Sequence, residues 1–330
     1  MRRRHLLAAP LVAPLAAPLV ARAQMGGASW TPSGPIRVIV PFAAGGTTDI
    51  LARLYGQRLT ETLGVSILVE NRGGGGGSIG ADLVAKAPPD GQVLLFHNST
   101  FSSTSAVMEF QNRAQHSIER DFAPISLGAL VPTVVMVHPS VPATTVPEFI
   151  AWARQQPSPP FYGSTGPGSA GHLVGEVLKR DGNFQMEHVP FRGASLLMQD
   201  LMVGRIQFGG DQLSTGLPHI RAGAVKPIAI RSTTRNRLLP EISTVREQGF
   251  PNAEILGWNG FFAPARTPEA VLLRLQAEIA AAARHPPLAA RIDELGADPG
   301  GNSRADFTAM VHAQVAALRP VVASLRIAAE

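Results

Sequence analysis

The chain has 330 residues, of which 45% are hydrophobic and 16% are charged, and its formal net charge is +5. This length exceeds the usual size of one hydrophobic core, so two domains are expected, and the composition excludes an intrinsically disordered protein. The chain has no cysteine, which excludes a disulfide framework and thiol catalysis.

Residues 1–23 predict a cleavable secretory signal peptide. Three arginines at positions 2–4 precede an apolar stretch that three prolines interrupt, and Ala21-Arg22-Ala23 has the A-x-A form of a cleavage site. The stretch is too short and too rich in proline to remain as a membrane helix. The arginines at its start fit a twin-arginine export signal or an ordinary signal with extra arginines. We therefore expect export to the periplasm.

Cleavage changes the charge of the chain. The signal carries four arginines and no acid, so the mature chain has 25 basic and 24 acidic residues and a net charge of +1. No basic surface remains that would favour nucleic acid. No other segment has 18 continuous apolar residues, so we expect a soluble mature protein.

The first half of the mature chain alternates between strands and helices. The apolar run IRVIV predicts a buried strand at 36–40, and the spacing of apolar residues after it predicts a helix over 47–63. A strand at 66–70, a helix at 78–87 and a strand at 92–97 follow. This alternation predicts right-handed crossovers and a parallel sheet.

The second half repeats the alternation and ends in helices. We expect strands at 132–139, 160–165, 185–191, 206–210 and 225–231. The helices expected between them lie at 146–155, 170–180, 194–203 and 217–222. Three final helices are expected at 268–284, 287–295 and 304–325.

These elements predict an α/β protein of two lobes, each a mainly parallel sheet flanked by helices. The final helices should return to cover the first lobe, which requires two crossings, at 123–132 and 257–268. The expected domains are a signal at 1–23, a first lobe at 24–127 and 257–330, and a second lobe at 128–256. A cleft between two such lobes is a natural ligand site that closes by hinge motion.

The stretch VPFAAGGTTDILARL, residues 40–54, predicts an anion site. Pro41 ends the strand, Gly45 and Gly46 allow a ligand to approach the backbone, and Thr47 or Thr48 can cap the helix. The free N–H groups and the helix dipole then attract an anion. The alternative is an ordinary strand-to-helix turn without a ligand.

A second stretch, YGSTGPGSAGHL at 162–173, has the same order of strand, small polar loop and helix. With one such loop in each lobe, the two could hold a small carboxylate from opposite sides of the cleft. Among the acids, Asp49 is expected to complement a helix dipole. Asp211 follows a strand and is either a ligand contact or a turn residue, and Arg192 is either a ligand contact or a solvated charge.

Other chemistries have weak support. Gly75, Gly77 and Gly80 match the dinucleotide pattern G-x-G-x-x-G, but five consecutive glycines match it by chance and no acid follows at the required place. Ser169 lies in PGSAG rather than G-x-S-x-G, and His172 has no acid at motif spacing. No metal-binding motif occurs. We expect no catalysis, metal or cofactor.

Five separated stretches resemble one family. PIRVIVPFAAGGTTDILAR, VENRGGGGGSIGADLVAKAPPDG, YGSTGPGSAGHL, VPFRGASLLMQDLMVGRI and GWNGFFAPARTP occur in this order. They resemble the periplasmic solute-binding proteins of the tripartite tricarboxylate transporter type, also called the Bug family. The resemblance covers essentially the whole mature chain. It implies a monomeric, two-lobed, type II-like Venus flytrap that binds a mono-, di- or tricarboxylic acid.

The family also implies delivery of the acid to a two-subunit membrane permease, and a ligand carboxylate held by backbone groups and waters of two loops. Gln207 and Gly210 depart from the residues that are common in relatives, which leaves the distal contacts open. The site residues implied here are Phe42, Ala44, Gly45, Gly46, Thr47, Thr48, Asp49, Asn98, Ser164, Thr165, Gly168, Ser169, Ala170, His172, Arg192, Gly193, Asp211 and Trp258.

Two other functions stay open on the sequence. One is an exported oxidoreductase that uses a nucleotide cofactor, suggested by the possible twin-arginine signal and the glycine run. The other is a sensor subunit that presents its closed form to a membrane receptor.

Overall fold

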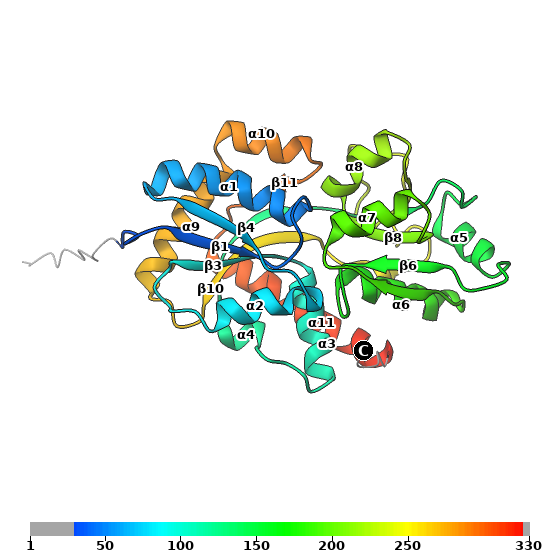
Figure 1. Ribbon diagram of the computed structural model, residues 1–330, viewed down its shortest axis with the longest axis horizontal. Coiled ribbons are helices and arrows are strands. Elements are labelled where there is room, and N and C mark those ends of the chain that lie inside the picture. Colours follow the sequence, from blue (N-terminus) through cyan, green and yellow to red (C-terminus); the bar gives the residue numbers. More distant parts are fainter. Residues whose placement is uncertain (1–29, 326–330) are drawn as a thin grey trace, which may run out of the picture.

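The computed structural model describes residues 30–325, and the predicted signal peptide lies outside these residues. Two sheets lie end to end along the long axis of the molecule, each covered by helices (Figure 1). The predicted α/β fold of two lobes is confirmed. Within residues 30–325, no helix combines the length and the apolar character that a membrane span requires.

The first lobe contains a six-stranded sheet of order β11-β4-β10-β3-β1-β2. Its strands are β1 (Ile36–Val40), β2 (Ile67–Asn71), β3 (Val93–Asn98), β4 (Phe122–Leu130), β10 (Trp258–Pro264) and β11 (Asp298–Pro299). Its helices are α1 (Thr47–Leu63), α2 (Ser78–Ala85), α3 (Thr100–Phe110), α4 (Ile118–Asp121), α9 (Glu269–Ala283) and α10 (Pro286–Glu294), and a short turn, η1 (Gly75–Gly77), precedes α2.

The second lobe contains a five-stranded sheet of order β7-β6-β8-β5-β9. Its strands are β5 (Thr133–Val137), β6 (Phe161–Ser164), β7 (Glu187–Pro190), β8 (Phe208–Gln212) and β9 (Lys226–Ile230). Its helices are α5 (Val146–Ala153), α6 (Ala170–Gly182), α7 (Ala194–Met202) and α8 (Leu213–Arg221), with a short turn, η2 (Pro251–Ala253), before the return crossing.

The two sheets are built on the same plan. Counted from β2 and from β7, the first three strands are parallel, and the fourth strand, β10 or β5, is antiparallel to its neighbours. The fourth strand is in both cases the one that has just entered from the other lobe. Four strands of each sheet therefore run in one direction, but the fourth strand is flanked by antiparallel ladders, so each sheet is mixed rather than mainly parallel.

The predicted crossings at 123–132 and 257–268 are largely strands. Residues 122–130 form β4, which pairs with β10 over the whole length of both strands. The ladder is irregular where it passes Ile125 and Gly128. The expected domain boundary after residue 127 falls inside β4, and the connection to β5 is only Val131 and Pro132.

Helix α3 was not predicted. Its sequence, TFSSTSAVMEF, is rich in serine and threonine, which favour caps and turns over helix interiors. In the structure the hydroxyl of Thr104 donates to the carbonyl of Thr100 at 2.8 Å, and residues 100–107 are buried between the lobes. Tertiary packing therefore overrides the local preference.

The last helix, α11 (Arg304–Leu325), belongs to both lobes. Phe307, Val311 and Val315 pack in the core of the first lobe, as the sequence predicted, but Leu318 and Val322 belong to the core of the second. Figure 1 shows α11 passing below the junction of the two sheets. The prediction that all final helices cover the first lobe was therefore wrong for the end of α11, whereas α9 and α10 follow it.

The two connections between the lobes, at residues 131–132 and at residue 257, lie in direct backbone contact. The N–H of Val131 donates to the carbonyl of Gly257 at 2.9 Å, and a Cβ placed on Gly257 would lie 2.0 Å from the carbonyl oxygen of Val131. Only glycine permits this approach, so the spacing of the two connections is set at this point.

We expect Gly257→Ala to destabilise the protein by about 1–3 kcal/mol, because the new methyl group collides with backbone rather than with a flexible side chain. The midpoint of urea unfolding measures this. Gly34→Ala is the matched control, since no atom lies within 4 Å of its Cβ, and it should change stability by less than about 0.5 kcal/mol. Equal stability of the two variants would contradict the close contact.

Candidate functional site

Several helix N-termini meet at one small cavity between the lobes. Residues before or at the start of α1, α3, α7 and α8 line it, and the loop between β6 and α6 adds a threonine. The first N–H groups of a helix lack partners inside the helix, and the helix dipole places partial positive charge there. The cavity is lined by Phe42, Gly46, Thr47, Thr48, Asn98, Thr165, Ala194, Asp211 and Gln212.

The hydrogen-bond donors of the cavity are neutral. None of the nine lining residues is lysine, arginine or histidine. The Asn98 amide donates to Thr48 Oγ1 at 3.0 Å, while its oxygen accepts from the N–H of Thr100, so the side chain links α1 to α3. Such a site can bind an anion through N–H and O–H groups without a full opposing charge.

Asp211 is the one ionisable residue in the lining. Burial raises its pKa to about 6, against the lowering effects of the Gln212 backbone, the Thr215 hydroxyl and the charge of Arg231. An acid in this position is unusual for a cavity whose other polar groups favour an anion.

The lobes contact each other around the cavity. Thr47 Oγ1 lies 2.7 Å from Ser214 Oγ and 2.8 Å from Thr215 Oγ1, and the N–H of Thr47 donates to Thr215 Oγ1 at 3.0 Å. The N–H of Ala43 donates to the carbonyl of Arg192 at 3.1 Å. These hydrogen bonds join the two lobes directly, so the structure is a closed form.

In this closed form the cavity measures about 10 Å³, which is about the space of one water molecule. Small-molecule sites usually measure hundreds of Å³. A ligand larger than water therefore requires the lobes to move apart.

The first predicted loop is braced from its own lobe. Asp49 accepts from the N–H of Gly45 at 3.0 Å, from Asn71 at 3.0 Å and from Arg53. Burial alone would raise the pKa of Asp49, but these hydrogen bonds hold it below its usual value. Its carboxylate is thus directed to the loop and α1, not to the cavity. Ala44, whose carbonyl accepts from Ser195 across the lobes, and Gly45 also lie outside the lining.

The second predicted loop is braced in the same way. His172 Nδ1 accepts from the N–H of Gly168 at 3.0 Å, and the His172 ring stacks on His188 at 4.0 Å. Ser169 caps α6 by accepting from the N–H of His172. Ser164 bonds His188 and the backbone of Gly166. Of this loop only Thr165 lines the cavity, whereas Ser164, Gly168, Ser169, Ala170 and His172 stand behind it.

Three further predicted residues occupy different environments. Arg192 is exposed, and its carbonyl accepts from the N–H of Ala43 in the first lobe. Gly193 is the N-cap of α7, and its Cβ position lies 2.8 Å from the nitrogen of Ala43 in the other lobe. Trp258 is a core residue of the first lobe: its ring packs on Phe262 and Phe307 and its indole N–H donates to Gln314.

Sequence reasoning missed Gln212, Ser214 and Thr215. Gln212 donates to the carbonyl of Trp258 and accepts from Asn259, which ties β8 to the crossing strand β10. The helix after β8 was expected from residue 217, whereas α8 begins at Leu213. The signal that was available is the pair Ser214-Thr215 shortly after the strand, because hydroxyl residues are common near the start of a helix.

The glycine run at residues 73–77 forms part of the contact between the two lobes. A Cβ on Gly76 would lie 2.7 Å from the carbonyl of Pro167, and one on Gly166 would lie 2.7 Å from the nitrogen of Gly76. Gly76 also has a positive φ of 61°. The run therefore packs on the second predicted loop and does not line the cavity.

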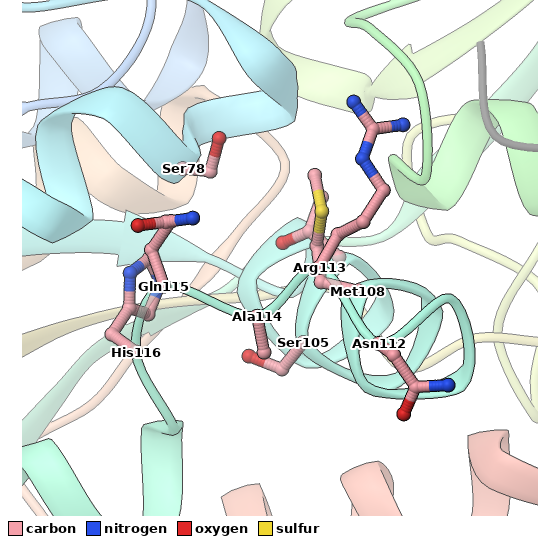
Figure 2. A pocket seen from close by; sticks show the side chains of 9 residues that line it. Ser78, Ser105, Met108, Asn112, Arg113, Ala114, Gln115 and His116 are labelled. Carbon is pink, nitrogen blue, oxygen red and sulfur yellow. The ribbon is translucent and has the colours of Figure 1, made fainter.

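A larger cavity of about 390 Å³ lies elsewhere in the first lobe, between α2 and the end of α3 (Figure 2). Ser78, Ser105, Arg113 and His116 are among its lining residues, and none of the predicted site residues lines it. This cavity is larger than the one between the lobes, but the helix N-termini converge on the smaller one. The described residues contain no group of three or more histidine, aspartate or glutamate side chains placed to hold a metal ion.

Comparison with known proteins identifies the family. The family described as "Tripartite tricarboxylate transporter family receptor" matches residues 51–327. The chain belongs to this receptor family. The resemblance predicted from the five sequence stretches is therefore confirmed. The family is one of solute-binding receptors.

Individual members are similar over most of their length. A UPF0065 protein from the tcbD-tcbE intergenic region of Pseudomonas sp. (strain P51) is 36% identical over 275 residues, which are 82% of this chain and 80% of that protein. R. palustris Rpa4515, solved with adipate, has a TM-score of 0.83 and 34% identity, covering 90% of this chain and 99% of that one. MatC from Rhodopseudomonas palustris, solved with bound malate, has a TM-score of 0.83 and 30% identity, covering 88% and 99%.

We expect Gly166→Ala to hinder closure of this receptor, because the new methyl group would meet Gly76 of the opposite lobe. The radius of gyration in small-angle X-ray scattering should rise towards that of an open form. Gly223→Ala is the control: it also has a positive φ in the second lobe, but no atom lies within 4 Å of its Cβ. A scattering curve of Gly166→Ala that matches the control would contradict this contact between the lobes.

Proposed function

We propose that this receptor captures a small mono-, di- or tricarboxylic acid in the cavity between its lobes. The observation that carries the proposal is the meeting of helix N-termini from both lobes around a cavity lined by neutral donors. The known ligands of two similar receptors, adipate and malate, support a carboxylate as the ligand class.

In this proposal the two predicted loops have different parts. Gly46, Thr47 and Thr48 from the first lobe and Thr165 from the second present donors to a ligand carboxylate, with Phe42 as a wall and Asn98 between α1 and α3. Asp49 and His172 hold these loops in place through the contacts described above. Ordered waters can fill the space that a smaller acid leaves, so one scaffold accepts acids of different shape.

Release is part of the function. A carboxylate held by neutral donors lacks the bidentate ion pair that arginine would provide, and it dissociates faster for that reason. The receptor closes on the acid in the periplasm and delivers it to a two-subunit membrane permease. The matched family supports a transporter partner. A monomer is sufficient for this cycle, since both halves of the site come from one chain.

We expect the mature protein to bind at least one of malate, adipate and citrate. Isothermal titration calorimetry measures the affinity, and a ligand at a hundred times its Kd should stabilise the fold by about 2.7 kcal/mol, seen as a rise in Tm. Matched amines without a carboxylate are the control ligands and should leave Tm unchanged. No response to any carboxylate, with a response to a nucleotide cofactor, would reject the proposed function in favour of an oxidoreductase.

We expect Gly46→Val to weaken carboxylate binding at least tenfold while the fold survives. A Cβ at Gly46 would lie 3.8 Å from the Cβ of Ala194, an ordinary contact, so Gly46→Ala should be tolerated. Valine adds two methyl groups at the cavity wall between the lobes. Calorimetry compares both variants with Gly34→Val, a control in open surroundings. If a folded Gly46→Val protein bound the acid with wild-type affinity, the start of α1 would not be part of the binding site.

A further inference from the structure

Asp211 faces no basic residue inside the cavity. It lines the same small space as Thr48, Asn98 and Thr165, and no lining residue is basic. A carboxylate ligand in this space would lie against the Asp211 carboxyl group. Two carboxylates in a closed site cannot both be ionised without a large cost, because each disfavours the charge of the other.

Arg231 is the basic residue whose charge lowers the pKa of Asp211, but it forms no salt bridge with Asp211. Arg231 is 1% exposed, and its guanidinium donates to the carbonyls of Ala253 at 3.3 Å and Ala170 at 3.4 Å. Among residues 30–325, no carboxylate lies within salt-bridge distance of Arg231. Its charge lowers the pKa of Asp211, but burial outweighs this effect and leaves the value at about 6.

The other ionisable groups around the site are neutral, engaged or directed elsewhere. Burial lowers the pKa of His172 to about 4, and that of His97, behind Phe42, to about 3. His188 bonds Ser164, Glu176 accepts from Tyr162 and Lys179, and Asp49 is held by Arg53. The Arg192 side chain is exposed. On β5, which pairs with β8, no residue is ionisable.

We propose that Asp211 takes up one proton from the solvent when the lobes close on a carboxylate ligand, and that the resulting carboxyl group donates a hydrogen bond to that carboxylate. This inference rests on the proposed function. No bond of the ligand breaks: one proton enters from the buffer, binds an Asp211 oxygen and leaves again when the ligand is released. Protonated Asp211 thereby favours a hydrogen-bond acceptor of the ligand, such as a carboxylate oxygen, over an amine of the ligand.

The sign of the pH dependence follows from the proton count. Above pH 6 the free protein carries ionised Asp211 and the complex carries one proton more, so raising the pH favours the free protein. The affinity for a fully ionised acid should fall about tenfold per pH unit there. At lower pH, Asp211 is already protonated in the free protein and this dependence fades.

The test is calorimetry of malate or adipate binding to the mature protein between pH 6.5 and 8.5, in two buffers that differ in ionisation enthalpy. The difference in heat between the buffers counts the protons taken up. We expect close to one proton per ligand at pH 8 for the wild type. We expect none for Asp211→Asn, because its amide donates a hydrogen bond without taking up a proton, so the affinity of this variant should not change with pH over this range.

A matched control is Asp200→Asn, an acid of the same lobe that pairs with Arg205 outside the cavity, which should keep the proton uptake of the wild type. The wild-type count needs no variant, so misfolding of Asp211→Asn would not prevent the test. Zero proton uptake in a binding wild type overturns this inference alone. The inference is also overturned if the affinity of the wild type rises with pH and Asp211→Asn no longer binds the acid. In that case an ionised Asp211 would accept a hydrogen bond from a donor group of the ligand. No binding of any acid overturns the proposed function as well.

Discussion

Four helices from two lobes begin at one cavity of about 10 Å³, and the arrangement of the protein follows from this meeting of N-termini. Each N-terminus contributes unpaired N–H groups and partial positive charge that would be costly to bury alone. A single anion satisfies several of them at once. In the closed structure, part of this need is met across the lobes, as where the N–H of Thr47 donates to Thr215.

The contacts around the cavity that hold the lobes closed are individually weak, so they can break and form again. They are hydroxyl and backbone hydrogen bonds, each of which contributes about 0.5–1.5 kcal/mol net, and close backbone approaches at glycines such as Gly76 and Gly166. Most of the large apolar clusters lie inside one lobe, but Ala106 and Val107 of α3 and the end of α11 pack in the core of the second lobe. Around the cavity itself, opening the cleft breaks mainly hydroxyl and backbone hydrogen bonds.

Charged groups close to the cleft are paired or held away from the ligand space. Asp49 is held by Arg53 and Asn71, and Glu176 by Lys179 and Tyr162, so both brace secondary structure. Asp211 is the exception within the lining. In the proposed function, the selectivity of the site depends on how this one acid and the ring of neutral donors share their hydrogen bonds with a ligand.

The sequence determined much of this protein by local pattern. It placed β1, α1 and α11, the start of α6, and the loops at 41–49 and 164–171, because apolar periodicity and glycine-hydroxyl turns are set by neighbouring residues. Seven of the nine lining residues were among those predicted. The family was likewise readable, because five continuous stretches in a fixed order carry the resemblance.

Only the tertiary structure decided the rest. Pairing between β4 and β10, residues more than a hundred positions apart, turned two expected connections into central strands. Burial between the lobes stabilised the polar helix α3, and packing placed Trp258 in a core and the end of α11 on the second lobe. The same long-range packing brought Gln212, Ser214 and Thr215 to the cleft. These outcomes depend on contacts between distant residues, about which a local pattern contains no information.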